Sequence, residues 1–237
     1  MVYQYLVRLQ DLLLPPHCRL CGDSSGQAAR LCAPCAAELP WLTTTCTQCA
    51  QPVTALSPHG HCGACQRRRP AFAQTTALFH YQPPVDHLLK RLKFARELAV
   101  APLLAGMLAE RLDQREQALP GQLVPVPLHH SRLRERGFNQ ATELARSLGR
   151  QLHIPVAHHL CKRLRPTEPQ SQLPPAARRL NLRNAFTVPG TPECSHLAIV
   201  DDVMTTGHTA NELARALKRA GAENVEVWVI ARAGRYL

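Results

Sequence analysis

The sequence predicts an α/β fold, with a parallel sheet flanked by helices, that follows a small cysteine-rich metal-binding module. Two observations predict the sheet. Short apolar runs alternate with helical patterns from about residue 73 onward, and one apolar run leads into two acids, a hydroxyl-rich turn and a helix. The module is predicted by eight of the ten cysteines, which lie within the first 65 residues. We expect the module over residues 1–70 and the α/β domain over residues 71–237.

All eight N-terminal cysteines occur in C-x-x-C pairs, and each pair can bring two thiolates to one tetrahedral ion. The pairs are Cys18/Cys21, Cys32/Cys35, Cys46/Cys49 and Cys62/Cys65. We predict two structural Zn²⁺ sites with four thiolates each. Sequential pairing of the motifs closes shorter loops and is favoured, whereas interleaved pairing stays open as an alternative. A disulfide framework would need a secretory context, and iron–sulfur clusters use a different spacing.

The next segment predicts a strand and two helices. Residues 73–81 form the strand, and Pro83 and Pro84 end it. Residues 85–94 predict an amphipathic helix whose leucines face inward and whose basic residues, Lys90, Arg91 and Lys93, face solvent. Residues 98–112 predict a second helix with Pro102 in its first turn.

A short strand at residues 123–127 is followed by a basic segment, which we interpret as a long turn. It contains Arg132, Arg136 and Gly137. Arginines beside a glycine can hold a pyrophosphate with paired hydrogen bonds. Asn139 is placed as the N-cap of the helix that follows.

Residues 160–165 predict a basic strand, and residues 185–188 predict another. The segment between them is long, rich in proline and poor in apolar residues, and it contains Gln170, Arg178 and Arg179. Such a segment inside a compact domain is typical of a flexible loop that closes over an active site. A plain exposed excursion remains the alternative.

The most informative stretch is residues 197–209. An apolar run at residues 197–200 predicts a buried parallel strand, and Asp201 and Asp202 follow where we expect that strand to end. The hydroxyl-rich turn comes next, and a helical pattern begins at Ala210, with Gly221 as its C-terminal cap. The turn consists of Thr205, Thr206, Gly207, His208 and Thr209. A final strand is predicted at residues 225–230.

A hydroxyl-rich turn before a helix binds an anion, because its backbone N–H groups converge at the helix N-terminus. Asp201 and Asp202 would repel that anion, so we expect them to accept hydrogen bonds from sugar hydroxyls or to act through a cation. A sugar phosphate meets both demands. The alternative is an acidic strand end that holds a metal, as in receiver or hydrolase domains.

Residues 197–209 resemble the phosphoribosyl pyrophosphate (PRPP) motif of type I phosphoribosyltransferases. The segments HLLKRLKF and V-P-V-P…R-x-R-G-F-N-Q, together with the cysteine pairs, resemble the ComF (competence protein F) family, including its GntX type. The resemblance implies the type I phosphoribosyltransferase fold, with PRPP and Mg²⁺ as ligands.

The resemblance also assigns roles to individual residues. Asp201 and Asp202 are the catalytic acids that hold the ribose hydroxyls. The turn from Thr205 to Thr209 holds the 5′-phosphate, and Arg132, Arg136 and Gly137 belong to the pyrophosphate loop. The loop with Gln170, Arg178 and Arg179 closes over PRPP. In that family the biological role is the uptake or use of DNA, but the acceptor of the phosphoribosyl group is not implied.

The charge of the chain indicates anionic partners. Lysine and arginine number 28 against 17 acids, and residues 132–183 hold eleven basic and three acidic residues. We expect PRPP or another ribose phosphate, single-stranded DNA and a helicase or other DNA-uptake protein as possible partners. A non-catalytic DNA-binding adaptor is the alternative function, although an aromatic content of 5% argues against a base-stacking platform.

No targeting or membrane segment is predicted. Residues 1–14 carry polar interruptions that exclude a signal-peptide core. The longest apolar stretch, residues 98–109, is shorter than the ~20 residues that cross a bilayer and contains Pro102. The sequence therefore predicts a soluble, cytoplasmic protein.

Overall fold

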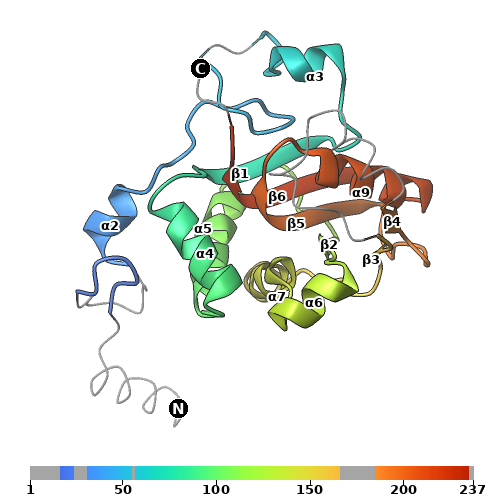
Figure 1. Ribbon diagram of the computed structural model, residues 1–237. Coiled ribbons are helices and arrows are strands. Elements are labelled where there is room, and N and C mark those ends of the chain that lie inside the picture. Colours follow the sequence, from blue (N-terminus) through green and yellow to red (C-terminus); the bar gives the residue numbers. More distant parts are fainter. Residues whose placement is uncertain (1–16, 24–30, 55–56, 166–184, 235–237) are drawn as a thin grey trace.

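A four-stranded parallel sheet in the order β1-β6-β5-β2 forms the centre of the protein in the computed structural model, which describes residues 17–23, 31–54, 57–165 and 185–234 (Figure 1). The strands of this sheet are β1 Gln74–His80, β2 Gln122–Pro125, β5 His196–Met204 and β6 Asn224–Arg232. The helices are α2 Ala33–Ala37, α3 Gly63–Arg67, α4 Val85–Phe94, α5 Val100–Asp113, α6 His130–Arg136, α7 Gln140–Leu152 and α9 His208–Arg219. The predicted parallel α/β architecture is confirmed.

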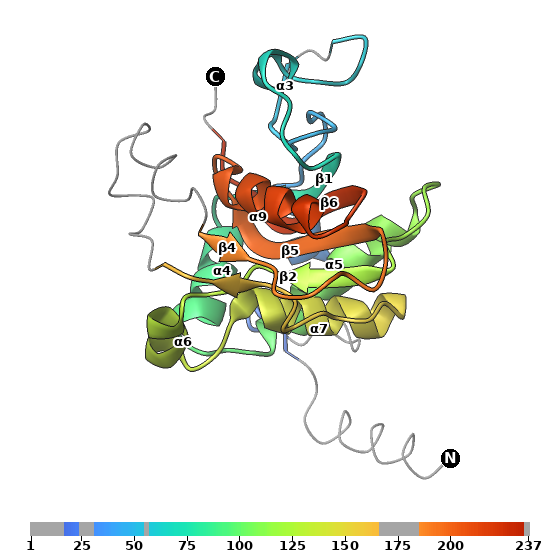
Figure 2. The ribbon, with the colours of Figure 1, turned by 90° about the vertical axis from the view of Figure 1, so that its right-hand side faces the viewer.

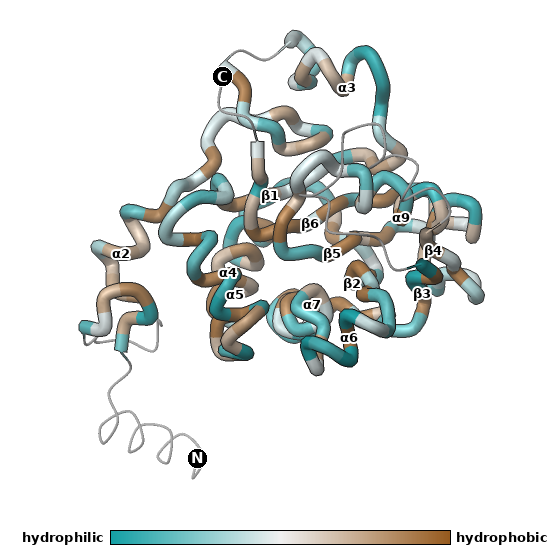
Figure 3. Tube along the Cα trace, in the orientation of Figure 1, coloured by the Kyte–Doolittle hydropathy of each residue, from teal (hydrophilic) through white to brown (hydrophobic). Residues whose placement is uncertain are grey.

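Helices cover both faces of the sheet. α4, α5 and α7 lie on one face and α9 lies on the other, as the two perpendicular views show (Figures 1 and 2). Side chains alternate along β5, so Leu197 and Ile199 pack toward α9, whereas Ala198 and Val200 pack toward α5 and α7. The buried parts of the strands are therefore mostly apolar, which Figure 3 shows as brown segments between the helices.

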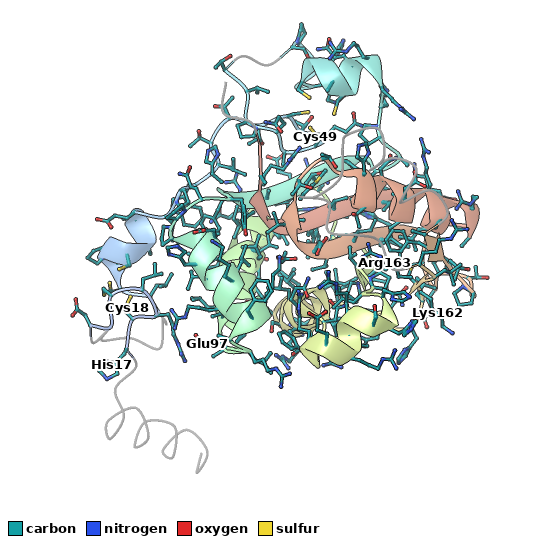
Figure 4. All side chains as sticks on the ribbon, in the orientation of Figure 1. His17, Cys18, Cys49, Glu97, Lys162 and Arg163 are labelled. Carbon is teal, nitrogen blue, oxygen red and sulfur yellow. The ribbon has the colours of Figure 1, made fainter. Side chains whose placement is uncertain are left out.

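The N-terminal module contacts the domain at two separate places. Cys18 belongs to the apolar core on the α4 and α5 side, whereas Cys46, Cys49 and Cys65 belong to the core on the α9 side. Figure 4 shows the sulfur atoms around Cys18 and those around Cys49 at two distinct positions on the molecule. Each half of the module therefore packs on a different face of the sheet.

The basic segment after β2 is a helix, not the long turn that we expected. The His129 side chain caps its N-terminus by accepting a hydrogen bond from the Ser131 N–H. Gly137 ends it with a φ of 82°, a left-handed conformation that favours glycine. Local capping at both ends thus stabilises the seven residues of α6 as a helix. Asn139 caps α7 as predicted, accepting from the Ala141 N–H at 3.0 Å.

Two other expectations need correction. The segments predicted as strands at residues 160–165 and 185–188 contain only β3 (Lys162–Arg163) and β4 (Phe186–Thr187), which pair antiparallel outside the main sheet. β5 does not end before the acids but continues to Met204, because β6 pairs with it beyond Asp201. The end of a strand depends on the strand with which it pairs, and the sequence of one segment does not show that partner.

The predicted flexible loop, with Gln170, Arg178 and Arg179, lies outside the described residues, as does the N-terminal segment that we tested for a signal peptide. Within the described part of the chain, none of the helices combines the length and apolarity that a bilayer crossing requires.

Candidate functional site

The carboxyl end of β5 brings the acid pair and the hydroxyl-rich turn (residues 205–209) together. α9 begins inside this turn at His208, and Gly207 is its N-cap, with a φ of 76°. The positive φ favours glycine at this position, whereas a Cβ atom there would meet only the flexible end of Met204, its Cε at 2.5 Å. The turn therefore directs the first N–H groups of α9 to the place where a phosphate is expected.

Asp201 and Asp202 occupy different environments. Asp202 is only 3% exposed and forms an ion pair with Lys93 of α4. Its other oxygen accepts a hydrogen bond from Gln140 Nε2 of α7 at 3.2 Å. Asp201 is partly buried, and it lines a cavity of about 30 Å³ with residues of the hydroxyl-rich turn. The two neighbouring acids therefore cannot contribute equally to ligand binding.

The two environments shift the pKa values in opposite directions. Burial and the neighbouring Asp202 charge raise the pKa of Asp201 well above its usual range. Burial alone would also raise the pKa of Asp202, but the Lys93 ammonium outweighs it and lowers that pKa. The pKa of Lys93 is raised in turn, because Asp202 more than offsets the effect of burial. Asp202 and Lys93 thus stabilise each other's charged forms, and Asp201 is the acid of higher proton affinity.

Cationic groups border the acid pair on two further sides. Arg136 of α6 donates to Gln140 Oε1 at 2.5 Å, and Gln140 contacts Asp202, so α6, α7 and β5 form one hydrogen-bonded chain. The Arg136 guanidinium also lies 5.6 Å from the ring centre of Phe94, whose side chain is 74% exposed. Arg163 of β3 is partly buried, and Asp201 acts on it electrostatically. The acid pair therefore has positive charge near it from Arg136 and Arg163.

The structure separates the predicted pyrophosphate residues. Arg136 points toward the acid pair, whereas Arg132 is exposed and pairs with Glu135 at 3.1 Å. Gly137 ends α6, and a Cβ atom added there would lie 3.7 Å from Arg96 Nη2. The structure thus brings Arg136 to the acid pair, and Arg132 and Gly137 remain at its margin.

Sequence reasoning assigned Lys93 to solvent and gave no role to Gln140, yet both contact Asp202. A signal for Lys93 was present. It lies four residues after Leu89, on the same helical stripe as Val85 and Leu89, where an amphipathic helix faces inward. The expectation that Lys93 faces solvent followed from its charge alone and not from its position on the helix. Gln140 carried no comparable signal, because a glutamine at a helix start is usually exposed.

The eight N-terminal cysteines form two compact groups, each with its ligand atoms within 4.8 Å of one another. We name them the first cysteine cluster (Cys18, Cys21, Cys32, Cys35) and the second cysteine cluster (Cys46, Cys49, Cys62, Cys65). The Sγ–Sγ distances of 3.6 Å between Cys21 and Cys32 and of 3.7 Å between Cys49 and Cys62 match the edge of ~3.8 Å that a Zn–S bond of ~2.3 Å gives in a tetrahedron. The thiols are free, and the sequential pairing is confirmed. Cys161 and Cys194 are also free thiols, and neither belongs to these clusters.

Similar proteins identify the family. Over 182 residues the chain is 37% identical to competence protein F of Haemophilus influenzae, covering 73% of this chain and 79% of that protein. This chain belongs to the competence protein F family. The DNA utilization protein YhgH of Escherichia coli O157:H7 is 36% identical over 208 residues, covering 85% of this chain and 90% of that protein.

Two known domain families match separate parts of this chain. Residues 9–66 match the double zinc ribbon domain, and residues 134–237 match the phosphoribosyl transferase domain. The fold is that of a phosphoribosyltransferase domain with a zinc ribbon module at its N-terminus, and the two clusters are Cys₄ sites suited to structural zinc. An adenine phosphoribosyltransferase of Leishmania tarentolae superimposes with a TM-score of 0.39 at 14% identity, over 66% of this chain and 91% of that one.

Proposed function

We propose that this protein binds PRPP with Mg²⁺ and transfers its phosphoribosyl group to an acceptor, in DNA uptake, DNA use or nucleotide salvage. One observation carries the proposal: the hydroxyl-rich turn, the acid pair and Arg136 meet at the carboxyl end of β5. The three groups correspond to the three parts of PRPP. The turn receives the 5′-phosphate, the acids receive the ribose hydroxyls, and Arg136 receives the pyrophosphate.

Asp201 and Asp202 have different roles in this proposal. Asp201 is partly buried and borders the turn, so it accepts hydrogen bonds from the ribose hydroxyls. Asp202 stays on Lys93 and Gln140, and it keeps those two side chains directed at the ligand. Asp201 is also the carboxylate that would hold Mg²⁺, because a hard cation prefers carboxylate oxygens and Asp202 is already paired. When bound, the cation neutralises part of the pyrophosphate charge.

The proposed reaction breaks the bond between ribose C1 and the pyrophosphate oxygen, and its electron pair leaves with pyrophosphate. A nucleophile of the acceptor forms the new bond at C1. Positive charge develops on the ribose ring as the old bond breaks, and the carboxylate of Asp201 stabilises it. Arg136 stabilises the negative charge that gathers on the leaving pyrophosphate.

Calorimetry tests the binding step. PRPP is expected to bind in a Mg²⁺-dependent manner, and the double substitution Asp201→Asn with Asp202→Asn is expected to weaken it at least a hundredfold. The lost charged acceptor at Asp201, worth ~1.5–3 kcal/mol, and the release of Lys93 and Gln140 from Asp202 together account for that loss. Pyrophosphate release from PRPP, in the presence of nucleobases or single-stranded DNA, tests the transfer. Equal PRPP affinity in the double variant and the wild type would reject the proposal.

A second candidate function is a DNA-binding adaptor with a regulatory PRPP pocket. Phe94 favours it, because an exposed aromatic ring beside Arg136 combines the stacking and positive charge that single strands require. Single-strand binding without pyrophosphate release from any supplied acceptor would favour this function over transfer.

A further inference from the structure

The second cysteine cluster contacts the hydroxyl-rich turn through one buried side chain, Arg232. This residue ends β6 and is 5% exposed. Its Nε donates to the Cys49 carbonyl at 2.8 Å, and one Nη donates to the Met204 carbonyl at 3.0 Å and to the Thr205 carbonyl. One guanidinium thus joins the cluster to the residue where the turn begins.

Arg232 needs a negative partner, because a buried charge is costly without one. In the part of the chain that the structure describes, no carboxylate forms an ion pair with it. Arg232 faces the second cysteine cluster instead, since its Nε bonds to the Cys49 carbonyl and it lines one cavity with Cys49, Cys62 and Cys65. Four thiolates around one Zn²⁺ leave a formal charge of about −2. The loaded cluster therefore supplies the counter-charge for Arg232.

A second contact reaches the other end of the turn. The Ala71 N–H, just after the module, donates to Asn211 Oδ1 in the first turns of α9 at 2.8 Å. The Asn211 N–H in turn donates to the Gly207 carbonyl at 2.9 Å. Both sides of the turn, the strand that enters it and the helix that leaves it, therefore contact the chain around the second cysteine cluster.

Part of this interface is open. A cavity of about 580 Å³ is lined by residues of the second cysteine cluster and of α9, with Arg68 and Arg215 among them. Apolar packing and the hydrogen bonds of Thr47 and Gln48 join this half of the module to Phe72 and Thr75, at the start of β1. The hydrogen bonds of Arg232 and Asn211 are the ones that reach the residues on either side of the turn.

We propose that Arg232 is a positioning residue that couples the second zinc site to the hydroxyl-rich turn, so that phosphate binding depends on the second zinc ion and not on the first. The ligand part of this inference rests on the proposed function. The coupling does not, since it concerns only the order of the turn.

The first cysteine cluster provides the control, because it contacts a different element. Arg19, next to Cys18, pairs with Glu97 at 2.7 Å, and its carbonyl accepts a hydrogen bond from Arg91 of α4 at 2.6 Å. Cys32 and Cys62 are matched positions: each is the third cysteine of its cluster, the N-cap of a five-residue helix and partly buried. Cys32→Ser and Cys62→Ser therefore damage the two clusters in the same way.

Hydrogen exchange tests the coupling without any ligand. In Cys62→Ser the backbone N–H groups of residues 206–209 are expected to exchange at least tenfold faster than in the wild type, with α7 unchanged. Cys32→Ser should leave residues 206–209 at the wild-type rate. Arg232→Met should reproduce the effect of Cys62→Ser while keeping the wild-type zinc content. Arg232→Lys, which keeps the charge but loses the planar fork, should give an intermediate rate.

Two results would overturn the coupling. One is equal exchange of residues 206–209 in Cys62→Ser and Cys32→Ser. The other is wild-type exchange in a folded Arg232→Met variant. If Arg232→Met does not fold, the pair of cysteine variants decides the question by itself.

Ligand binding extends the test. Cys62→Ser should weaken ribose 5-phosphate about tenfold and leave inorganic pyrophosphate unchanged, whereas a general loss of structure would weaken both. If the wild type does not bind ribose 5-phosphate, the proposed function fails, and the exchange experiment still decides whether the second zinc site orders the turn.

Discussion

At the scale of single residues, two adjacent aspartates have opposite electrostatic environments. Successive side chains of a strand point to opposite faces, so Asp202 meets Lys93 from α4 while Asp201 faces the cavity beneath the turn. Ion pairing stabilises the charge of Asp202. Burial beside that charge destabilises the charge of Asp201. Asp202 therefore has a structural role as part of an ion pair, whereas the charged form of Asp201 is destabilised.

We predict that Asp201→Asn increases the free energy of unfolding at pH 7 by about 1 kcal/mol while weakening PRPP. The raised pKa of Asp201 means that its contribution to stability is lost as the pH rises above the unfolded value of about 3.9. The asparagine avoids that loss, so its advantage should vanish near pH 3. Urea unfolding of wild type and variant between pH 3 and pH 8 measures it.

Asp202→Asn is the matched variant, and we predict the opposite result. It leaves the partly buried Lys93 without its counter-charge, so the free energy of unfolding should fall by about 3 kcal/mol at pH 7. The pair stabilises the wild type over a wide range, because the lowered pKa of Asp202 limits the loss to acid and the raised pKa of Lys93 limits it to alkali. Destabilisation by both asparagine variants would contradict the division between the acids.

At the scale of elements, helix α6 determines which arginine reaches the acid pair. Arg132 and Arg136 are four residues apart, so they lie on one face of this short helix, about 6 Å apart along its axis. Arg136 lies at the end of the helix and bonds to Gln140, which contacts Asp202, whereas Arg132 lies one turn earlier and pairs with Glu135. The position along the helix therefore favours Arg136.

We predict that Arg136→Ala weakens PRPP and inorganic pyrophosphate at least tenfold and spares ribose 5-phosphate, which has no pyrophosphate group. One charge-assisted hydrogen bond of ~1.5–3 kcal/mol accounts for the loss. Arg132→Ala is the control, with a smaller effect on all three ligands. Calorimetry with the three ligands measures the contrast, and equal loss of ribose 5-phosphate would remove the pyrophosphate role from α6.

At the scale of the whole molecule, the two cysteine clusters contact different elements of the candidate site. The first cysteine cluster contacts α4, the helix that carries Lys93, and the second contacts the hydroxyl-rich turn through Arg232. Thus the N-terminal module is more than an appendage, because each half contacts an element that carries site residues. The free energy of Zn²⁺ binding, ~10–16 kcal/mol per site, is large enough to order both α4 and the hydroxyl-rich turn.

We predict that the purified protein carries about two zinc ions per chain, held by the eight clustered cysteines. Cys161→Ser and Cys194→Ser should leave the zinc content unchanged, because neither residue belongs to a cluster. Elemental analysis of the wild type and the two variants measures it. Intact disulfides in mass spectrometry would contradict the prediction.

We also predict weak, sequence-independent binding of single-stranded DNA through the basic segment from Arg132 to Arg183. With about three phosphate contacts, the affinity should fall about tenfold between 50 and 200 mM salt. PRPP should compete, because Arg136 serves both ligands. Fluorescence anisotropy over a salt series measures the slope, and a flat salt dependence would exclude an electrostatic contact.

The sequence by itself determined the features that depend on local chemistry. Spacing of the cysteine pairs predicted both clusters and their sequential pairing, since short loops close at the least entropic cost. Apolar runs and helical stripes predicted β1, α4, α7 and α9, because each element buries one face of its own pattern. The turn was recognisable for the same reason, since a glycine between threonines before a helix is a local arrangement.

Only the tertiary structure decided which distant residues meet. Lys93 and Gln140 contact Asp202, and Arg232 contacts Cys49 and Thr205, across separations that no local pattern encodes. β5 continues past the acids because β6 lies beside it, and α6 forms because both its ends are capped. These features depend on how the helices and strands pack against one another. That packing gives neighbouring acids opposite pKa shifts and brings a zinc ribbon to the turn.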